Sequence, residues 1–156
     1  MENDFDLFVV DLNGSLRGKR LLGDSLEKVM EEGIKLPRSV AGLDFWGDDV
    51  PDNGLVFETG DNDGICMPIQ SRPVPVPWTK KERHQLHAMM ENPDGTPFDV
   101  DPRQALKNIV DKFHARGWYP VMATELEFYL MDGTAEEEQR PRPPVLDKSH
   151  GRRLNT

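Results

Sequence analysis

Cysteine is almost absent from this chain of 156 residues, because Cys66 is the only one. A single cysteine excludes an internal disulfide and a zinc site built from cysteines, and it gives no indication of secretion. The first six residues include three acids and lack the basic start and apolar stretch of a signal peptide. No apolar run approaches the length of a membrane span. We therefore expect a cytoplasmic protein.

Positive charge is also scarce. The net charge is -9, and residues 140–156, with five Lys/Arg against one Asp, contribute +4, so that residues 1–139 carry -13. An acidic body argues against nucleic acid or a membrane surface as a partner, since both are themselves anionic. Divalent cations or cationic amines suit it better, although the acidity also serves solubility alone.

Several motifs of well-known enzyme classes are missing. The chain has no Walker loop, no Rossmann glycine motif and no nucleophile elbow. The stretch Asp61-Asn62-Asp63-Gly64 begins like a calcium loop, but the next ligand positions hold unsuitable residues, so a tight turn is favoured. His84, His87 and His114 lack a cysteine or carboxylate partner at ligand spacing. We interpret them as surface or packing histidines.

The first part of the chain predicts a mixed sheet with a packed helix. Two apolar runs within residues 7–22 flank Asn13-Gly14, a strong hairpin signal. A capping box from Asp24 to Glu27 predicts a short helix that ends at Gly33. Further strands are expected over 39–43, 54–59 and 65–70, whereas 82–91 fits either a strand or a short helix. A hairpin followed by a helix is typical of a β-grasp domain, which we assign to residues 1–98 with their proline-rich connection.

The second part begins with the clearest helix of the chain. Asp101 is placed as its N-cap, Pro102 takes the first helical position, and apolar residues recur on one face, which predicts a helix over 101–116. An apolar and aromatic stretch predicts a strand over 118–130. We expect residues 99–132 to begin a second domain, and 133–156 to form a flexible tail, first acidic and then basic, with too few apolar residues to fold.

The predicted strand contains a pair of carboxylates, Glu125 and Glu127. Side chains two apart in a strand point to the same face, roughly 6.5 Å apart at their Cα atoms. Such a pair suits magnesium or manganese, which bind through one or two protein carboxylates together with substrate phosphates. On pattern alone, the more ordinary interpretation is a half-buried strand with an acidic solvent face.

At Glu125–Leu130 the sequence resembles the strand of glutamine synthetases whose Glu-x-Glu-Phe pattern supplies two metal ligands. Three further motifs follow the order of that family: the first hairpin (Val10–Gly14 with Arg17–Leu21), the Gly-Asp-x-Asp-Gly turn (Asp61–Gly64) and the opening of the helix before the metal strand (Asp101–Arg103). The resemblance covers residues 7–131 and only the N-terminal portion of the family. Within the family, the sequence looks most like the γ-glutamylputrescine synthetase branch.

This resemblance implies an α+β enzyme that uses ATP to phosphorylate the γ-carboxylate of glutamate and lets ammonia or an amine displace the phosphate. It implies Mg²⁺ or Mn²⁺ as cofactor, with Glu127 on the metal nearer glutamate and Glu125 on the metal at the nucleotide phosphates. In the family, a loop of the β-grasp domain reaches the active site of a neighbouring subunit in a homo-oligomeric ring. Asp44 is the closest counterpart of the amine-site Asp on that loop, and Phe45-Trp46-Gly47 replaces the Ser-containing pattern that usually follows it.

The other metal ligands and the residues that bind ATP and glutamate belong, in the family, to a region beyond the metal strand. We therefore expect the chain to be a truncated ligase that is inactive alone. One alternative is a non-catalytic interaction module that joins rings of a full-length homologue through its β-grasp domain. Another is a small amine or metal binder, disfavoured because two carboxylates leave most of a cation's coordination to water.

Overall fold

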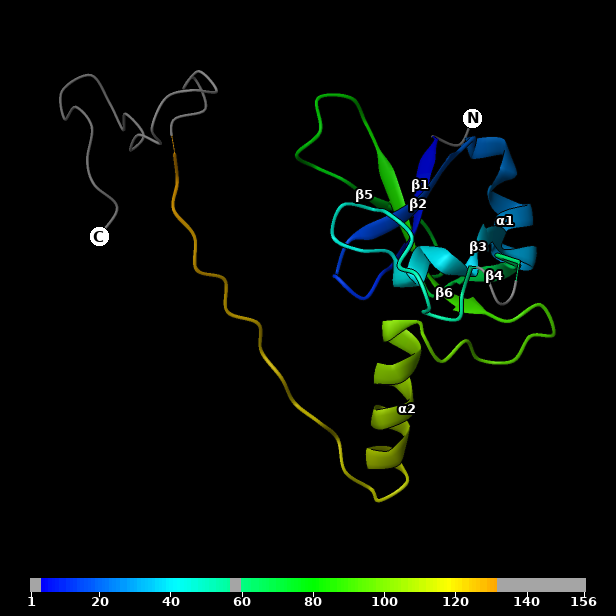
Figure 1. Ribbon diagram of the computed structural model, residues 1–156. Helices are drawn as coiled ribbons and strands as arrows, with labels where there is room; N and C mark the ends of the chain where they lie inside the picture. The colour runs from blue at the N-terminus through cyan, green and yellow to red at the C-terminus, as the bar shows by residue number, and fades with distance from the viewer. Residues whose placement is uncertain (1–3, 57–59, 132–156) are drawn as a thin grey trace. The chain divides into compact units, whose positions relative to one another are not determined.

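The computed structural model describes residues 4–56 and 60–131. The chain divides into two compact units, Met1–Pro120 and Val121–Thr156, each of which is described by itself. The first unit combines a mixed sheet with the helices α1 and α2 (Figure 1). The α+β class expected from the sequence is therefore confirmed.

The predicted hairpin is present. Strand β1 (Phe5–Val10) pairs antiparallel with β2 (Leu16–Leu21), so that Phe5 lies opposite Leu21 and Val10 opposite Leu16. Gly14 has φ of 80°, a conformation that glycine adopts without strain, and its N–H donates to the Asp11 carbonyl at 3.0 Å. The Asn-Gly signal thus located the turn correctly.

Helix α1 (Leu26–Glu32) starts later than the capping box predicted. Residues Gly23–Ser25 form a 3₁₀ turn, closed by the Ser25 N–H on the Leu22 carbonyl at 3.0 Å. Asp24 therefore lies inside that turn, and Ser25 is the N-cap without a side-chain capping bond. The predicted end at Gly33 is confirmed, with φ of 69°.

The sheet is completed by strands that come from both sides of a long loop. These are β3 (Ile34–Pro37), β4 (Asp63–Pro68), β5 (Val74–Pro75) and β6 (His84–Glu91). The order is β2-β1-β6-β4-β3, with β5 paired to β6. β1 and β6 run parallel, whereas the other pairs are antiparallel. The segment that fitted either element is thus a strand.

Alternating side chains of the central strands form the core. Phe5, Leu7 and Val9 of β1 are buried, and every second residue of β6 from Leu86 is buried as well. Helix α1 contributes Val29 to this core, which includes the following residues: Phe5, Leu7, Val9, Val29, Leu36, Ala41, Leu55, Cys66, Leu86, Ala88, Met90 and Phe98.

Two predicted strands differ from the structure. Residues Arg38–Gly42 form a 3₁₀ helix with Ser39 and Ala41 buried, so the strand expected over 39–43 is wrong. A short apolar run does not distinguish a strand from a helical turn, and here the turn leads the chain from β3 into the loop. Of the strand expected over 54–59, residues 54–56 form none, and 57–59 lie outside the described residues.

Helix α2 (Pro102–His114) begins where it was predicted and ends two residues before the predicted end at residue 116. The Asp101 carboxylate accepts from the Arg103 N–H at 2.7 Å, Pro102 occupies the first turn, and Gly117 follows with φ of 72°. The apolar face, in contrast, is open: Leu106 and Ile109 are 52% and 50% exposed. Gln104 is the buried residue of this helix.

The strand expected over 118–130 is not formed in the structure. Residues 118–131 carry neither helix nor strand and are exposed throughout, and Figure 1 draws them without an arrow. A strand needs a neighbour to accept and donate its hydrogen bonds. No strand among the described residues pairs with this segment. The tail expected over 133–156 lies outside the described residues.

Candidate functional site

Asp44 lies in the loop that follows the 3₁₀ helix, with its carboxylate fixed by its own backbone. The oxygen Oδ1 accepts the N–H groups of Trp46, Gly47 and Asp48 at 2.8, 2.9 and 2.9 Å. The turn is closed by the Asp44 N–H on the Asp48 carbonyl at 2.9 Å. No described residue donates to Oδ2. One oxygen of the carboxylate thus shapes the loop, and the other is open to a ligand.

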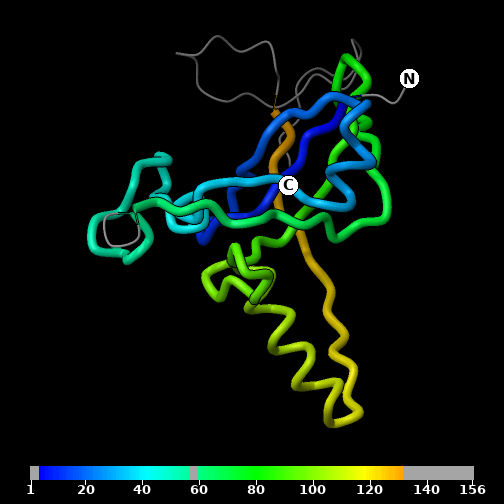
Figure 2. The backbone as a smooth tube through the Cα atoms, turned by 90° about the vertical axis from the view of Figure 1, so that its right-hand side faces the viewer, coloured from blue at the N-terminus to red at the C-terminus, as the bar shows by residue number. Residues whose placement is uncertain are grey.

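Two exposed aromatic residues follow Asp44 directly in the sequence. Phe45 and Trp46 are 73% and 84% exposed and meet edge to face, with ring centroids 5.4 Å apart. Figure 2 shows the loop that follows the 3₁₀ helix, up to residue 56, extending to one side of the sheet. A carboxylate next to exposed rings can attract an alkylammonium ion, through its charge and through the ring faces.

Two hydrogen bonds join the β1–β2 turn to the segment that leads into this loop. The Leu12 N–H donates to the Ala41 carbonyl at 3.0 Å, and the Asn13 side-chain amide donates to the Leu43 carbonyl at 2.8 Å. The backbone that directly precedes Asp44 is therefore hydrogen-bonded to the β1–β2 hairpin of the sheet. The two segments lie about thirty residues apart in the sequence, so their pairing was not predicted.

Asp11 is a charged residue whose importance the sequence interpretation missed. It is 1% exposed, and its Oδ1 accepts from the Asn13 and Ser15 N–H groups at 2.9 and 2.8 Å. Its Oδ2 accepts from Arg17 Nε at 2.9 Å. The signal was available, because an Asp directly after a buried strand needs donors and an Arg follows six residues later.

Glu125 and Glu127 both lie in the exposed segment 121–131. Among residues 4–56 and 60–131, no group of three His, Cys, Asp or Glu side chains could hold a metal ion. Two carboxylates on an unpaired segment do not complete the coordination of Mg²⁺ or Mn²⁺. By themselves they fit a metal only as two ligands of a larger set.

Cys66 does not serve as a nucleophile. It is fully buried in β4, and burial, followed by the nearby charge of Asp101, raises the pKa of its thiol to about 12. The thiolate is the reactive form of cysteine, and it is negligible near neutral pH at that pKa. The residue belongs to the core.

His87 of β6 is a packing histidine, as expected. Its Nδ1 lies 3.2 Å from an Arg103 guanidinium nitrogen, and because arginine only donates, this Nδ1 is the acceptor and the ring is neutral. Burial, together with the charge of Arg103, lowers the pKa of His87. The contact joins the first turn of α2 to the sheet.

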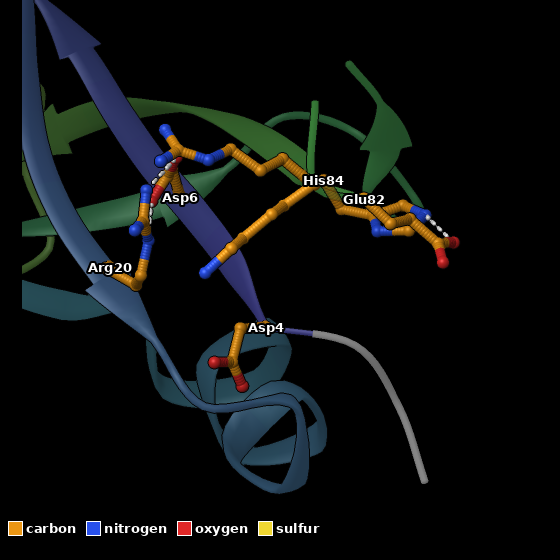
Figure 3. A pocket seen from close by; sticks show the side chains of 7 residues that line it. Asp4, Asp6, Arg20, Glu82 and His84 are labelled. Atoms are coloured by element: carbon orange, nitrogen blue, oxygen red, sulfur yellow. Dashed lines mark hydrogen bonds and ion pairs between the residues drawn. The ribbon is translucent and has the colours of Figure 1, made fainter. Parts of the chain in front are cut away.

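A hollow lies near the start of β1, between Arg20 of β2 and the residues that lead into β6 (Figure 3). It has a volume of about 290 Å³. Asp6 is paired with Arg20 at 2.8 Å, and His84 Nε2 lies 3.9 Å from Glu82. The lining groups are Asp4, Asp6, Glu82, Arg20, Lys81, Arg83 and His84, three acids against three permanent cations. This balance gives no net charge with which to select an ionic ligand.

The comparisons with known proteins point in one direction. Residues 99–155 match the catalytic domain of glutamine synthetase. The chain is 39% identical over 139 residues to γ-glutamylputrescine synthetase of Escherichia coli K12, covering 89% of this chain and 29% of that protein. It is 27% identical over 143 residues to a glutamine synthetase of Thermotoga maritima, covering 90% of this chain and again 29% of the relative. The chain thus spans about three tenths of the length of these relatives.

The fold agrees with these matches. A crystal structure of a novel glutamine synthase homolog superposes with a TM-score of 0.62 at 22% identity, covering 74% of this chain and 28% of that one. In the part of the chain that the structure describes, no helix is long and apolar enough to cross a membrane.

Proposed function

This chain is related to the glutamine synthetase family, and on that premise we propose that it is the N-terminal part of an ATP-dependent ligase that joins glutamate to ammonia or an amine. The observation that carries the proposal is the 39% identity to γ-glutamylputrescine synthetase. The sheet of residues 1–98 is then the β-grasp domain of that family. Residues 99–132 then begin the catalytic domain, in keeping with the match to the glutamine synthetase catalytic domain, which starts at residue 99.

In the proposed reaction, ATP phosphorylates the γ-carboxylate of glutamate, and the nitrogen of ammonia or an amine then forms the amide bond while phosphate leaves. The cationic amine has to be attracted before it loses a proton. Asp44 is suited to this task because its Oδ1 is used in the turn and its Oδ2 is open. The exposed Phe45 and Trp46 rings favour an amine with an alkyl chain over ammonia.

Glu125 and Glu127 are proposed as two ligands of Mg²⁺ or Mn²⁺, with the remaining ligands supplied from outside the described residues. A bound divalent cation would neutralise charge on phosphate oxygens. The same proposal makes the assembly a homo-oligomeric ring in which the Asp44 loop serves the neighbouring subunit. The extension of that loop to one side of the sheet is compatible with such an arrangement (Figure 2).

The proposal is tested by a hybrid in which this chain replaces the aligned segment of the E. coli relative. We expect ATP-dependent formation of a γ-glutamyl amide from glutamate and a primary amine. Glu125→Gln and Glu127→Gln should each lower the rate by about 100-fold, since they remove metal ligands. Glu31→Gln, on the exposed side of α1, is the matched control. A folded hybrid that binds ATP but forms no amide with any amine or ammonia would contradict the proposal.

Asp44→Asn tests the amine role without disturbing the loop, because the amide oxygen still accepts the three backbone N–H groups. We expect the KM for the amine to rise about tenfold or more in the hybrid, while the KM for glutamate stays the same. An unchanged amine KM would leave Asp44 with a purely structural role.

The 156 residues alone are proposed to be inactive, because they provide only part of a metal site. The purified chain should form no γ-glutamyl amide under conditions in which the hybrid does. A second candidate function, a non-catalytic module that associates with full-length homologues, is favoured by the exposed apolar side chains of α2. Co-purification of the inactive chain with such a homologue, and a changed activity of that homologue, would support it.

A further inference from the structure

Arg17 connects the buried charge of the β1–β2 turn to the Asp44 loop. Its side chain is 26% exposed, and its Nε is held at 2.9 Å by Asp11, whose side chain is fully buried. Asp11 also accepts two backbone N–H groups of the turn, so the carboxylate that orients Arg17 is itself fixed. The Asp11 carboxylate therefore fixes the orientation of the Arg17 guanidinium group.

This orientation directs the guanidinium group toward Gly47. The Arg17 Nη1 and Nη2 atoms lie 3.3 and 3.9 Å from the point where a Cβ atom on Gly47 would stand. Gly47 has φ of 93°, and its N–H is one of the three that bind Asp44 Oδ1. A side chain at this position would be strained and would press on the guanidinium group. The close approach thus needs glycine on one side and a fixed arginine on the other.

Together with the bonds from Leu12 to Ala41 and from Asn13 to Leu43, this contact supports the loop at three points. Two of them precede Asp44, and the third follows it. The capped turn is held between them, so that the open carboxylate oxygen keeps a constant position relative to the sheet.

We infer that Arg17, oriented by buried Asp11 and lying against Gly47, is a positioning residue that fixes the Asp44 carboxylate for binding an alkylammonium substrate. The substrate part of this inference rests on the proposed function, whereas the positioning part does not. The competing view is that the Asp11–Arg17 pair only stabilises the hairpin. The two views differ in what happens to the loop when the hairpin is kept intact.

The first test uses the 156-residue chain. Removing Arg17 alone would leave the buried Asp11 charge unpaired and could unfold the hairpin. The double variant Asp11→Asn/Arg17→Gln is therefore used, since it keeps an acceptor for the turn and a possible hydrogen bond across the pair. Arg20→Gln is the control, because it breaks the other Arg–Asp pair of the same hairpin, away from the loop.

The readout is amide hydrogen exchange, followed by NMR, at Trp46, Gly47 and Asp48, the donors to Asp44. We expect exchange to accelerate about tenfold or more in the double variant and to stay unchanged in the control, with core amides such as Leu86 unaffected in both. Unchanged loop exchange in the double variant would overturn the inference. So would an equal acceleration in the control.

The second test uses the ligating hybrid. The double variant should raise the KM for the amine about fivefold or more without raising the KM for glutamate or ATP. Adding Asp44→Asn to the double variant should raise the KM for the amine by a smaller factor than Asp44→Asn does in the otherwise unchanged hybrid, because both changes act on the same carboxylate. Additive effects, or an equal rise in all KM values, would overturn the link to the amine. A hybrid without ligase activity would refute the proposed function, and the exchange experiment would still decide the positioning role.

Discussion

Strand β6 and helix α2 both carry an apolar face at the spacing of their secondary structure, yet only the face of β6 is buried. Leu86, Ala88 and Met90 are at most 1% exposed, whereas Leu106 and Ile109 are about half exposed. The pattern of a sequence predicts which face an element will bury. Whether that face is covered depends on a partner, and the described residues bury the face of β6 but leave that of α2 about half exposed.

The same contrast extends to residues 118–131. This segment is rich in apolar and aromatic residues, but Val121 is 94% and Leu126 80% exposed. Contiguous exposed apolar residues are uncommon on isolated soluble domains. The second candidate function, association with a homologue, would use these residues as well as the exposed apolar side chains of α2.

A matched pair of leucine truncations gives the largest expected difference. Leu86→Ala should lower the free energy of unfolding by about 3 kcal/mol, because it opens a cavity in the centre of the sheet. Leu106→Ala should change it by less than about 0.5 kcal/mol, since the side chain is half exposed. Urea unfolding followed by circular dichroism measures both. Equal losses would mean that the apolar face of α2 is covered.

The attachment of α2 to β6 through Asp101 gives the next largest expected effect. Asp101 is 1% exposed, and its carboxylate accepts the N–H of Met90 in β6 at 2.7 Å and that of Arg103 in α2 at 2.7 Å. Asp101→Ala removes the N-cap and leaves a buried donor of β6 unpaired, which should cost about 2 kcal/mol. The exposed Asp99 provides the control, and Asp99→Ala should be close to neutral. A neutral Asp101→Ala would show that α2 is not attached through this residue.

The elements that were predicted correctly are those specified by neighbouring residues. The Asn13-Gly14 turn and the Asp101-Pro102 start of α2 each depend on conformational preferences within a few residues. The capping box misplaced the N-cap of α1 by one residue, from Ser25 to Asp24, because residues Gly23–Ser25 form a 3₁₀ turn. The strand expected over 39–43 failed because its short apolar run fits a 3₁₀ helix equally well.

In the candidate site, too, the feature specified by neighbouring residues was predicted and the long-range contact was not. Asp44 was selected by resemblance, and its turn is local. The Asp11–Arg17 pair itself has a local signal, but its support of the Asp44 loop was missed because it joins the hairpin to a segment about thirty residues away. Long-range pairing of this kind is not encoded in any local pattern. The metal-ligand assignments of Glu125 and Glu127 remain predictions.

The burial of His87, together with its contact with Arg103, makes the attachment of α2 to the sheet pH-dependent. Because the folded-state pKa of His87 is lowered, the unfolded chain takes up the proton first as pH falls below about 6.5. This contribution to stability is therefore present above that pH and is lost as pH falls through the folded pKa. Unfolding free energies between about pH 5 and 7.5 should fall less steeply for His87→Gln than for the wild type.

The polar side of α2 gives the smallest expected effect. Lys107 and Asp111 form an ion pair one turn apart, with both side chains more than half exposed. Such pairs contribute about 0.3–0.5 kcal/mol and are screened by salt. Lys107→Gln should accelerate amide exchange within α2 about twofold at low salt, and the difference from wild type should vanish in about 1 M salt. Since α2 is attached mainly through its first turn, its remaining turns depend on local interactions of this size. A larger effect that persists in salt would instead mean that Lys107 contacts a partner surface that covers the helix.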